Sequence, residues 1–414
     1  MCRMKDSGID WIGKIPANWS TSKLKYLGNY INGYAFKPDE WGDSGLPIIR
    51  IQDLTGSNDS PNYYDGTIDR KFLIQNGDIL VSWAATLDAF IWNKGPGWLN
   101  QHIFKAIPDQ SKIDYNFFFW MIKEAMKNMN NDNKHGIFMQ HVTLDVFSNF
   151  SIPMPPLSAQ RQIADFLDVE CARIDAVIEQ TRASIEEYKK LKQSVITQAV
   201  TKGIRPNRPM KDSRIPWIHS CPQDWEECRI KNAVFPIEKP VLPTDEIITC
   251  FRDGEVTLRK NRREDGFTIS FTEHGYHGVD IGDLVIHGMD AFAGAIGCSD
   301  SRGKTTPVVH VCETIGNNRY FMYYLRSLAF GNILMDLSNG VRIRSSDFRN
   351  FQKLGVFGVL VPPRKEQDEI VDYLDDKTEK IDKLLSEKEK LIHELKTYKQ
   401  SVIYEFVTGK KEVV

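Results

Sequence analysis

The chain has 414 residues, of which 41% are apolar and 11% aromatic, and its formal net charge is −2. This length predicts two to three domains, the apolar content excludes a wholly disordered chain, and no apolar run approaches the roughly 20 residues that span a bilayer. Proteins that bind nucleic acid alone are usually basic. Any such binding here must therefore come from local basic patches or be shared with a partner.

The first residues, MCRMKDSGIDWIG, carry charges and no apolar core, so we expect no secretory signal. The seven cysteines are scattered and include no CxxC pair. This pattern indicates a reducing compartment and argues against a disulfide framework or a zinc site. We expect a cytoplasmic protein.

A short motif near the start recurs half a chain later. Residues 11–19 and 217–225 both follow the pattern W-I-x-x-x-P-x-x-W. Because the tryptophans are paired in both copies, we predict that they anchor the chain in a core and do not contact a ligand. Each motif leads into a globular region, about 20–152 and 226–361, in which short apolar runs bounded by turn signals predict mixed α and β structure.

Each globular region is followed by one long predicted helix. Residues 160–203 align without a gap with residues 367–410, so that Gln193 returns as Gln400, 207 positions later. Prolines stand before each helix and glycines end it, which marks its borders. At about 44 residues each helix is roughly 66 Å long. The resulting segments are a first domain (1–155), a central helix (156–203), a second domain (204–362) and a C-terminal helix (363–414).

Alternating steps of three and four residues predict an apolar seam on each long helix. The seam residues are Ile174, Val177, Tyr188, Leu191 and Val195 in the first helix and Ile381, Leu384, Leu391, Leu395, Tyr398 and Val402 in the second. Thr181 and Ser184 weaken the first seam in its middle, and Lys388 breaks the second. The two helices are expected to bury these seams against each other, antiparallel if the repeats are related by a pseudo-twofold axis. An intermolecular coiled coil between two chains remains the alternative.

Catalytic motifs are missing from the sequence. Gly303-Lys304-Thr305 lacks the first glycine of a phosphate loop, since position 298 is Cys298, and we interpret it as a turn. There is no GxGxxG after a strand, no GxSxG and no HExxH. His274 and His277 alone give a weak metal signal and are better explained by a turn or a base-contacting loop. We therefore expect no catalytic residues, no cofactor and no metal, and a chain that is not itself an enzyme.

The remaining chemistry is that of binding. Arginine suits phosphate oxygens and the guanine edge, whereas amides and histidines read base edges and lysines position the backbone. The candidate DNA-binding residues are Arg259, Lys260, Arg262, Arg263, His277, Arg342 and Arg344 in the second half and Lys37, Arg50, Lys71, Gln101, His102, Gln140 and His141 in the first. For any single one of these, a solvated surface side chain is the alternative interpretation.

The order of these features, twice over, resembles the specificity (S) subunit of type I restriction–modification enzymes. The resemblance covers the whole chain. It rests on the two W…P…W motifs, on GDILV at 77–81 and GDLVI at 282–286, and on the IPMPPLSAQRQI run at 152–163, whose counterpart at 361–370 opens the second helix. The globular regions between these landmarks differ almost completely, as expected if two copies do the same kind of work on two different targets.

This resemblance implies an α+β architecture in which two mixed α/β target-recognition domains are joined by two long helices that form an intramolecular antiparallel coiled coil, with a pseudo-twofold internal repeat. It implies a non-catalytic subunit that recognises double-stranded DNA, each domain reading one half of a bipartite site and the helices setting the spacer. It also implies partners: two methyltransferase subunits docked on the helices, which carry S-adenosylmethionine and methylate adenines, and motor–nuclease subunits in the restriction complex. A 66 Å helix corresponds to no more than about 19 base pairs.

Two other functions are open to the sequence. A scaffold or adaptor would carry two unlike protein-binding domains on a coiled-coil strut, and a neighbouring reading frame for an adenine methyltransferase would speak against it. An autonomous enzyme would need an unrecognised site in the loops and would show turnover as an isolated chain.

Overall fold

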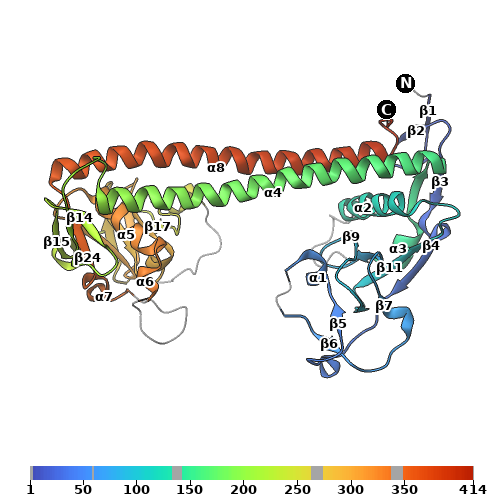
Figure 1. The fold of residues 1–414 in the computed structure, drawn as a ribbon, viewed down its shortest axis with the longest axis horizontal. Coiled ribbons are helices and arrows are strands. Elements are labelled where there is room, and N and C mark those ends of the chain that lie inside the picture. The colour runs from blue at the N-terminus through green and yellow to red at the C-terminus, as the bar shows by residue number, and fades with distance from the viewer. Residues whose placement is uncertain (1–2, 58–59, 133–141, 263–273, 337–347, 414) are drawn as a thin grey trace. The chain divides into compact units, whose positions relative to one another are not determined.

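The computed structural model describes residues 3–57, 60–132, 142–262, 274–336 and 348–413 (Figure 1). It divides into unit 1, Met1–Thr181 with Lys390–Val414, and unit 2, Arg182–Glu389. Both boundaries fall inside a long helix, α4 (Leu157–Lys202) or α8 (Arg364–Val407). Each unit therefore holds one globular domain with a part of each long helix.

Unit 1 is built around two four-stranded sheets. The first has the antiparallel order β4-β11-β8-β9, and in the second, β6-β5-β10-β7, only β10 and β5 are parallel. The strands of these sheets are β4 (Gly28–Asn32), β5 (Leu46–Ile49), β6 (Tyr63–Tyr64), β7 (Leu73–Ile74), β8 (Ile79–Ser82), β9 (Asp88–Ile91), β10 (Gly97–Leu99) and β11 (Ile103–Pro108). Two strand pairs complete the unit: β1 (Met4–Asp6) with β2 (Lys14–Pro16), and β3 (Ser20–Lys23) with β12 (Ser151–Met154).

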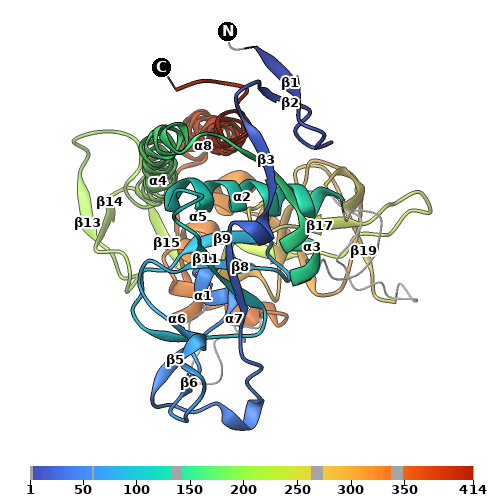
Figure 2. The same ribbon diagram turned by 90° about the vertical axis from the view of Figure 1, so that its right-hand side faces the viewer.

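The helices of unit 1 are α1 (Ile51–Thr55), α2 (Tyr115–Asp132) and α3 (Leu144–Asn149). Helix α2 lies against β9, as Figure 2 shows. Its apolar face, which includes Phe117, Phe118 and Met121, shares one core with Leu167 of α4 and Phe406 of α8. The long helices are therefore part of the domain core and not only a connection.

Unit 2 repeats the first sheet with other residues. Its sheet β16-β23-β20-β21 is antiparallel and has the same order of equivalent strands as β4-β11-β8-β9. These strands are β16 (Val234–Pro236), β20 (Leu284–His287), β21 (Ile296–Cys298) and β23 (Val309–Thr314). Four strand pairs surround it: β13 (Met210–Asp212) with β14 (Ser220–Pro222), β15 (Glu226–Arg229) with β24 (Gly358–Val361), β17 (Ile248–Cys250) with β18 (Val256–Leu258), and β19 (His277–Val279) with β22 (Gly303–Thr305).

The helices of unit 2 are α5 (Asn318–Phe330), α6 (Ile333–Asp336) and α7 (Phe351–Gly355). Helix α5 lies against β20 and β21, in the place that α2 has in unit 1. Its buried Tyr320 and Phe321 share a core with Val200 of α4 and Leu374 of α8. Both units thus combine a mixed α/β domain with two helix segments, which confirms the predicted fold class.

The long helices end as the sequence predicts. Gly203 and Gly409 have φ of 77° and 70°, in the left-handed region that glycine adopts without strain. Each glycine also faces a tryptophan of a W…P…W motif, because a Cβ at Gly203 would lie 3.3 Å from Trp225 and one at Gly409 2.9 Å from Trp19. Trp225 and Trp19 are buried, in line with the predicted anchoring role.

In each unit the two helix segments run antiparallel and pack along a heptad stripe, since the first part of α4 meets the last part of α8 in unit 1 and the remaining parts meet in unit 2. The stripe, buried or half-buried, runs through Cys171, Ile174, Ile178, Thr181, Ile185, Tyr188, Lys192 and Val195 in α4 and Thr378, Ile381, Leu385, Lys388, Ile392, Leu395, Lys399 and Val402 in α8. All eight positions of α8 are counterparts of those in α4, 207 residues on. The predicted Ile174, Tyr188, Val195, Ile381, Leu395 and Val402 lie in this stripe.

The other half of the predicted seam is wrong. Val177, Leu191, Leu384, Leu391 and Tyr398 are 37%, 48%, 38%, 42% and 50% exposed, so they flank the interface. The period of 3.5 residues fits two adjacent columns equally well where apolar residues stand side by side, as Val177 does beside Ile178. The true stripe steps by four residues after Ile174. It includes Thr181, whose hydroxyl donates to Val177 O at 2.7 Å, so that the polar group is satisfied in the seam.

Candidate nucleic-acid interface

An aromatic row lies beside the second sheet of unit 1. It consists of Tyr34, Phe36, Tyr64, Phe72 and Trp98, and it starts from the Tyr34–Phe36 contact, whose ring centroids are 4.8 Å apart. Phe72 lies 5.7 Å from Tyr34, Tyr64 lies 5.2 Å from Phe36, and Trp98 lies 6.4 Å from Tyr64. Phe36 is buried and the other four rings are half-buried, so the row packs against the domain as well as facing its surface.

Two of the predicted DNA-binding cations of unit 1 lie at aromatic side chains. Lys71, in the 3-10 turn Arg70–Phe72, has its Nζ 4.9 Å from the Phe72 ring centroid and 3.3 Å from Asp69 Oδ2. Arg50 places its Cζ 5.1 Å from the Trp41 ring. Lys37 is exposed and directly follows Phe36 of the aromatic row. Of these pairs, only Arg50 and Trp41 are brought together by the fold, since Lys71 and Lys37 are sequence neighbours of Phe72 and Phe36.

Gln101 and His102 lie together in the turn between β10 and β11, next to Trp83. Trp83 Nε1 donates to the Gln101 carbonyl at 3.1 Å, and the His102 ring is exposed with its centroid 5.4 Å from that of Trp83. The side-chain Oε1 of Gln101 is buried and has no hydrogen-bond partner among the described residues. Buried polar groups are normally paired, so this acceptor stands out. Gln140 and His141, the other candidates of this half, lie outside the described residues.

The predicted basic cluster of unit 2 is committed to ion pairs. Lys260, in the 3-10 turn Arg259–Asn261, lies 2.5 Å from Glu246 Oε2. Arg262 contacts Asp253 at 2.6 Å and Glu255 at 3.0 Å, and its Cζ is 4.3 Å from the Phe251 ring. Hydrogen bonding to Asp253 holds the pKa of Arg262 above its ordinary value. The charges of this cluster are largely balanced within the domain, which the sequence spacing of its arginines did not reveal.

The other candidates of unit 2 are less open to a ligand or not described. Arg259 Nε donates to Thr249 Oγ1 at 3.3 Å, so the guanidinium is bonded to β17. His277 Nε2 lies 2.8 Å from the Val309 carbonyl and is half-buried, which gives the ring a structural contact. Arg263, Arg342 and Arg344 lie outside the described residues.

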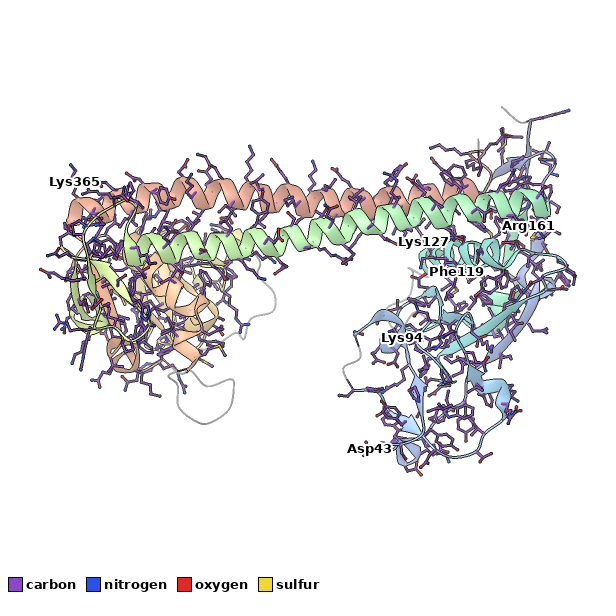
Figure 3. All side chains as sticks on the ribbon, in the orientation of Figure 1. Asp43, Lys94, Phe119, Lys127, Arg161 and Lys365 are labelled. Carbon is purple, nitrogen blue, oxygen red and sulfur yellow. The ribbon has the colours of Figure 1, made fainter. Side chains whose placement is uncertain are left out.

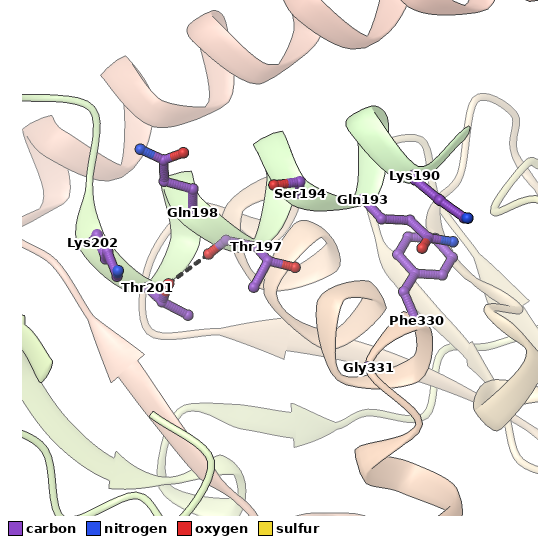
Figure 4. Close-up of a pocket in the computed structure, with 9 residues that line it drawn as sticks. All are labelled: Lys190, Gln193, Ser194, Thr197, Gln198, Thr201, Lys202, Phe330 and Gly331. Atoms are coloured by element: carbon purple, nitrogen blue, oxygen red, sulfur yellow. Dashed lines mark hydrogen bonds between the residues drawn. The ribbon is translucent and has the colours of Figure 1, made fainter. Parts of the chain in front are cut away.

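A polar groove of about 550 Å³ lies within unit 2, between the end of α4 and the end of α5 (Figure 4). It is lined by Lys190, Gln193, Ser194, Thr197, Gln198, Thr201, Lys202, Phe330 and Gly331. Its lining holds two lysines and no carboxylate. All the charged side chains of its lining are therefore positive, although no sequence motif pointed to it.

Sequence reasoning also missed Trp41 and Phe72, whose rings meet the cations described above. The only signal was an aromatic residue close to a basic one, as in Lys71-Phe72, and such pairs are common on ordinary surfaces. Trp92 is a third case, because the Nζ of Lys94 (Figure 3) lies 5.7 Å from its ring and 2.7 Å from the Asp53 carbonyl.

Two negative findings hold for the described residues alone. Over these residues, no three His, Cys, Asp or Glu side chains are grouped so that they could hold a metal ion. In the same part of the chain, no helix has the length and apolarity that crossing a membrane requires.

Comparison with known proteins gives a consistent result. Residues 16–187 match the type I restriction modification DNA specificity domain. Over 281 residues, 62% of this chain, the sequence is 28% identical to the specificity subunit of the type I restriction enzyme EcoBI from Escherichia coli. Over 223 residues, 53% of this chain, it is 26% identical to the MjaVIII specificity subunit from Methanocaldococcus jannaschii. These matches cover 58% and 50% of the relatives, so the chain spans about half the length of the curated relatives it matches.

A solved chain from a study of complex assembly and conformational transition of the type I R–M system has the same fold. It aligns with a TM-score of 0.66 over 96% of this chain and 99% of its own length, at 15% identity. In its matched domain and its curated relatives, the chain is similar to the specificity subunits of type I restriction–modification systems.

Proposed function

We propose that this chain is the non-catalytic subunit that recognises double-stranded DNA for a type I restriction–modification complex, in the cytoplasm. The two domains, 1–155 and 204–362, each read one half of a bipartite site, and the helices at 156–203 and 363–414 set the spacer. The observation that carries this proposal is the repeat itself. Equivalent sheets stand on equivalent helix positions but present unlike surfaces, as two readers of different sequences must.

The proposed contacts differ between the domains. In the first domain, Lys37, Arg50 and Lys71 meet phosphates while Gln101, His102, Gln140 and His141 read bases. In the second domain, the corresponding residues are Arg259, Lys260, Arg262, Arg263, His277, Arg342 and Arg344. On binding, Lys260 and Arg262 then exchange their carboxylate partners for phosphates. Because an ion pair is lost for each one formed, each contact contributes less binding free energy. The positive groove beside α4 offers an additional backbone contact.

The proposed partners are two methyltransferase subunits, which carry S-adenosylmethionine, and motor–nuclease subunits in the restriction complex. The exposed flank of the helix pair supports docking there. Leu191 and Leu384 lie at nearly one level, since the adjacent Lys192–Asp382 ion pair fixes the register in unit 2. Val177 and Tyr398 are their counterparts in unit 1, where the Asp175–Lys399 pair has the same role. Exposed apolar residues that recur in this way mark a protein interface.

The decisive experiment maps methylated adenines across the host genome with and without this gene. We expect methylation at one two-part motif that is lost on deletion and restored by the intact gene. Retention of all adenine methylation, together with capture of partners unrelated to DNA, would instead favour the adaptor. Leu191→Asp with Leu384→Asp should release the methyltransferase subunits from the purified complex, whereas Gln180→Asp, at an exposed position on the same helix, should not.

A further inference from the structure

A buried glutamine in the first turn of each long helix is hydrogen-bonded to the N-terminal end of a shorter helix, α2 in unit 1 and α5 in unit 2. In unit 1, Gln160 is 1% exposed, and its Nε2 donates to the Pro155 carbonyl at 2.9 Å. Its Oε1 accepts the backbone N–H of Asp114 at 2.7 Å. Asp114 is also the residue whose carboxylate accepts the N–H groups of Asn116 and Phe117 at the first turn of α2. The amide of Gln160 therefore ties α4 to the N-terminus of α2.

Unit 2 has the same arrangement around Gln367, the counterpart of Gln160. Gln367 is 2% exposed, its Nε2 donates to the Pro362 carbonyl at 2.9 Å, and its Oε1 accepts the N–H of Asn317 at 2.8 Å. Asn317 caps α5 by accepting the N–H of Arg319 at 2.9 Å. A Cβ at Gly316 would lie 2.2 Å from this amide oxygen, so the preceding loop is shaped around it.

Two helical turns further on, a carboxylate makes a second connection. In unit 1, Asp168 accepts Trp120 Nε1 at 2.7 Å and Asn116 Nδ2 at 3.0 Å. In unit 2 its counterpart Asp375 accepts Tyr323 Oη at 2.8 Å and a guanidinium N–H of Arg319 at 2.7 Å. In both units two donors one turn apart on the shorter helix meet one acceptor on the long helix.

A third contact has kept its place but changed its chemistry. Arg161 (Figure 3), next to the first glutamine, lies 3.9 Å from the Asp114 carboxylate. Its counterpart Asp368 accepts Asn317 Nδ2 at 2.7 Å. We call these three contacts in each unit the helix clamp.

The spacing of the helix clamp shows what is held fixed. Its members on the long helices are 207 residues apart, whereas those on α2 and α5 are 203 apart, as Asp114 and Asn317 are. The segment between the start of the shorter helix and the long helix is therefore four residues longer in unit 2, and the surfaces of the two domains differ in chemistry. The shorter helix is nevertheless joined to the long helix by polar contacts at equivalent positions in both units. Buried hydrogen bonds are directional, and breaking one leaves a donor and an acceptor unpaired.

The helix clamp also reaches the candidate interface. Helix α2 lies against β9 and helix α5 against β21, each in the main sheet of its domain. A rotation of α2 or α5 about its long helix would turn the whole domain and displace its surface along a DNA groove. A domain held only by apolar packing could rock in this way, because such contacts are not directional.

We propose that Gln160 and Asp168, with their counterparts Gln367 and Asp375, are positioning residues that fix each recognition domain to its helix and thereby restrict the chain to one spacer length. This inference rests on the proposed function and deepens it. The long helices set the length of the spacer between the half-sites, and the helix clamp prevents each domain from rotating relative to its long helix. In this proposal the four residues act through the position of the domains and not through contacts with DNA.

The test uses Tyr323→Phe, which removes one hydroxyl from the clamp of unit 2, and Gln367→Met, which removes both bonds of the amide. Tyr324→Phe is the matched control on the same helix, since its buried hydroxyl donates to the Gly358 carbonyl of β24 and not to α8. The full-length proteins, isolated with the subunits they carry, select from a library of randomised double-stranded oligonucleotides.

We expect the wild-type protein and Tyr324→Phe to enrich two half-sites at one separation. The two clamp variants should enrich the same half-sites over several separations, with Gln367→Met the broader. Variants that keep the single separation, or a control that broadens equally, would overturn the inference while leaving the proposed function intact. A wild-type protein that enriches no two-part sequence would overturn both.

Discussion

The ammonium of Lys192 lies 2.7 Å from the carboxylate of Asp382 and joins α4 to α8 in unit 2. Unit 1 has the same ion pair with its ends exchanged, because Lys399 and Asp175 are 2.5 Å apart. Lys399 is the counterpart of Lys192, and Asp382 that of Asp175. The two ion pairs therefore give both units the same antiparallel register.

This ion pair predicts a measurable but small coupling. The Lys192 and Asp382 side chains are 27% and 53% exposed, and such pairs contribute about 0.2–1 kcal/mol because solvent screens them. A double-mutant cycle with Lys192→Ala and Asp382→Ala, followed by urea denaturation, should give a coupling in this range. The charge-swapped double variant should recover most of the loss caused by Lys192→Asp alone. A cycle on Glu186 and Lys189, which pair within α4, is the control for a contact that does not join the helices.

The corrected seam predicts unequal costs for similar truncations of α4. Ile185→Ala removes a side chain that is 6% exposed and should cost about 2–4 kcal/mol of unfolding free energy, because it leaves a cavity in the seam. Leu191→Ala, at a residue 48% exposed, should cost under about 1 kcal/mol. Urea denaturation of both variants decides the register. Equal costs, or a larger one for Leu191, would restore the original seam.

The heptad stripe also determines which insertions can lengthen the pair of long helices. An insertion in α4 alone would put its stripe out of register with that of α8. Seven residues inserted after Thr181 and seven after its counterpart Lys388 preserve the heptads, and each helix gains about 10.5 Å. The spacer should lengthen by no more than about three base pairs while both half-sites stay unchanged. Mapping of the methylated sites measures the spacer length directly. Altered half-site bases would contradict the proposal that the helices set the spacer alone.

The ion pairs of unit 2 predict a gain of affinity from losing a negative charge. Burial opposes ionisation of Asp253, yet the hydrogen bond from Arg262 holds the pKa of Asp253 below its ordinary value. If Arg262 contacts phosphate, Asp253→Asn removes one of the two carboxylates that pair with the guanidinium and should tighten DNA binding. Arg262→Ala should weaken binding and reduce its salt slope by about 1. Titrations at several salt concentrations measure both. Unchanged affinity in both variants would remove Arg262 from the interface.

Buried thiols predict a pH dependence of stability. Burial raises the pKa of Cys250 to about 12 from an ordinary value near 9. The thiol stays neutral in the folded chain while the unfolded chain ionises, so its contribution to stability is complete below about pH 9 and is lost as pH rises towards 12. At pH 8, iodoacetamide should modify Cys250 only after unfolding in urea, since the thiolate is the reactive form. Mass spectrometry of Cys250 peptides checks this, and rapid modification of the native protein would contradict its burial.

Features that depend on spacing alone could be predicted from the sequence. The long helices, their glycine ends and the buried Trp19 and Trp225 follow from a repeat that any fold must accommodate. The seam register could not be chosen, because apolar residues occupy adjacent columns and only packing distinguishes Val177 from Ile178. The basic cluster was recognised by its arginines, but the sequence does not show which carboxylates pair with them, namely Glu246 before β17 and Asp253 and Glu255 before β18. The aromatic row likewise joins residues that are far apart in the sequence, from Tyr34 to Trp98, and only the fold brings them together.

The sharing of both long helices between the units has a consequence for biosynthesis. The core of unit 1 includes Val402, Ile403, Phe406 and Val407, which the ribosome adds hundreds of residues after the first strands. The core of unit 2 is complete once Leu374 has emerged. The domain that is translated first is therefore the last to complete its core. Until α8 has been synthesised, the apolar face of α4 in unit 1 stays uncovered. Premature termination in α8 between Leu374 and Val402 would leave the first domain without part of its core, whereas the core of the second domain would be complete.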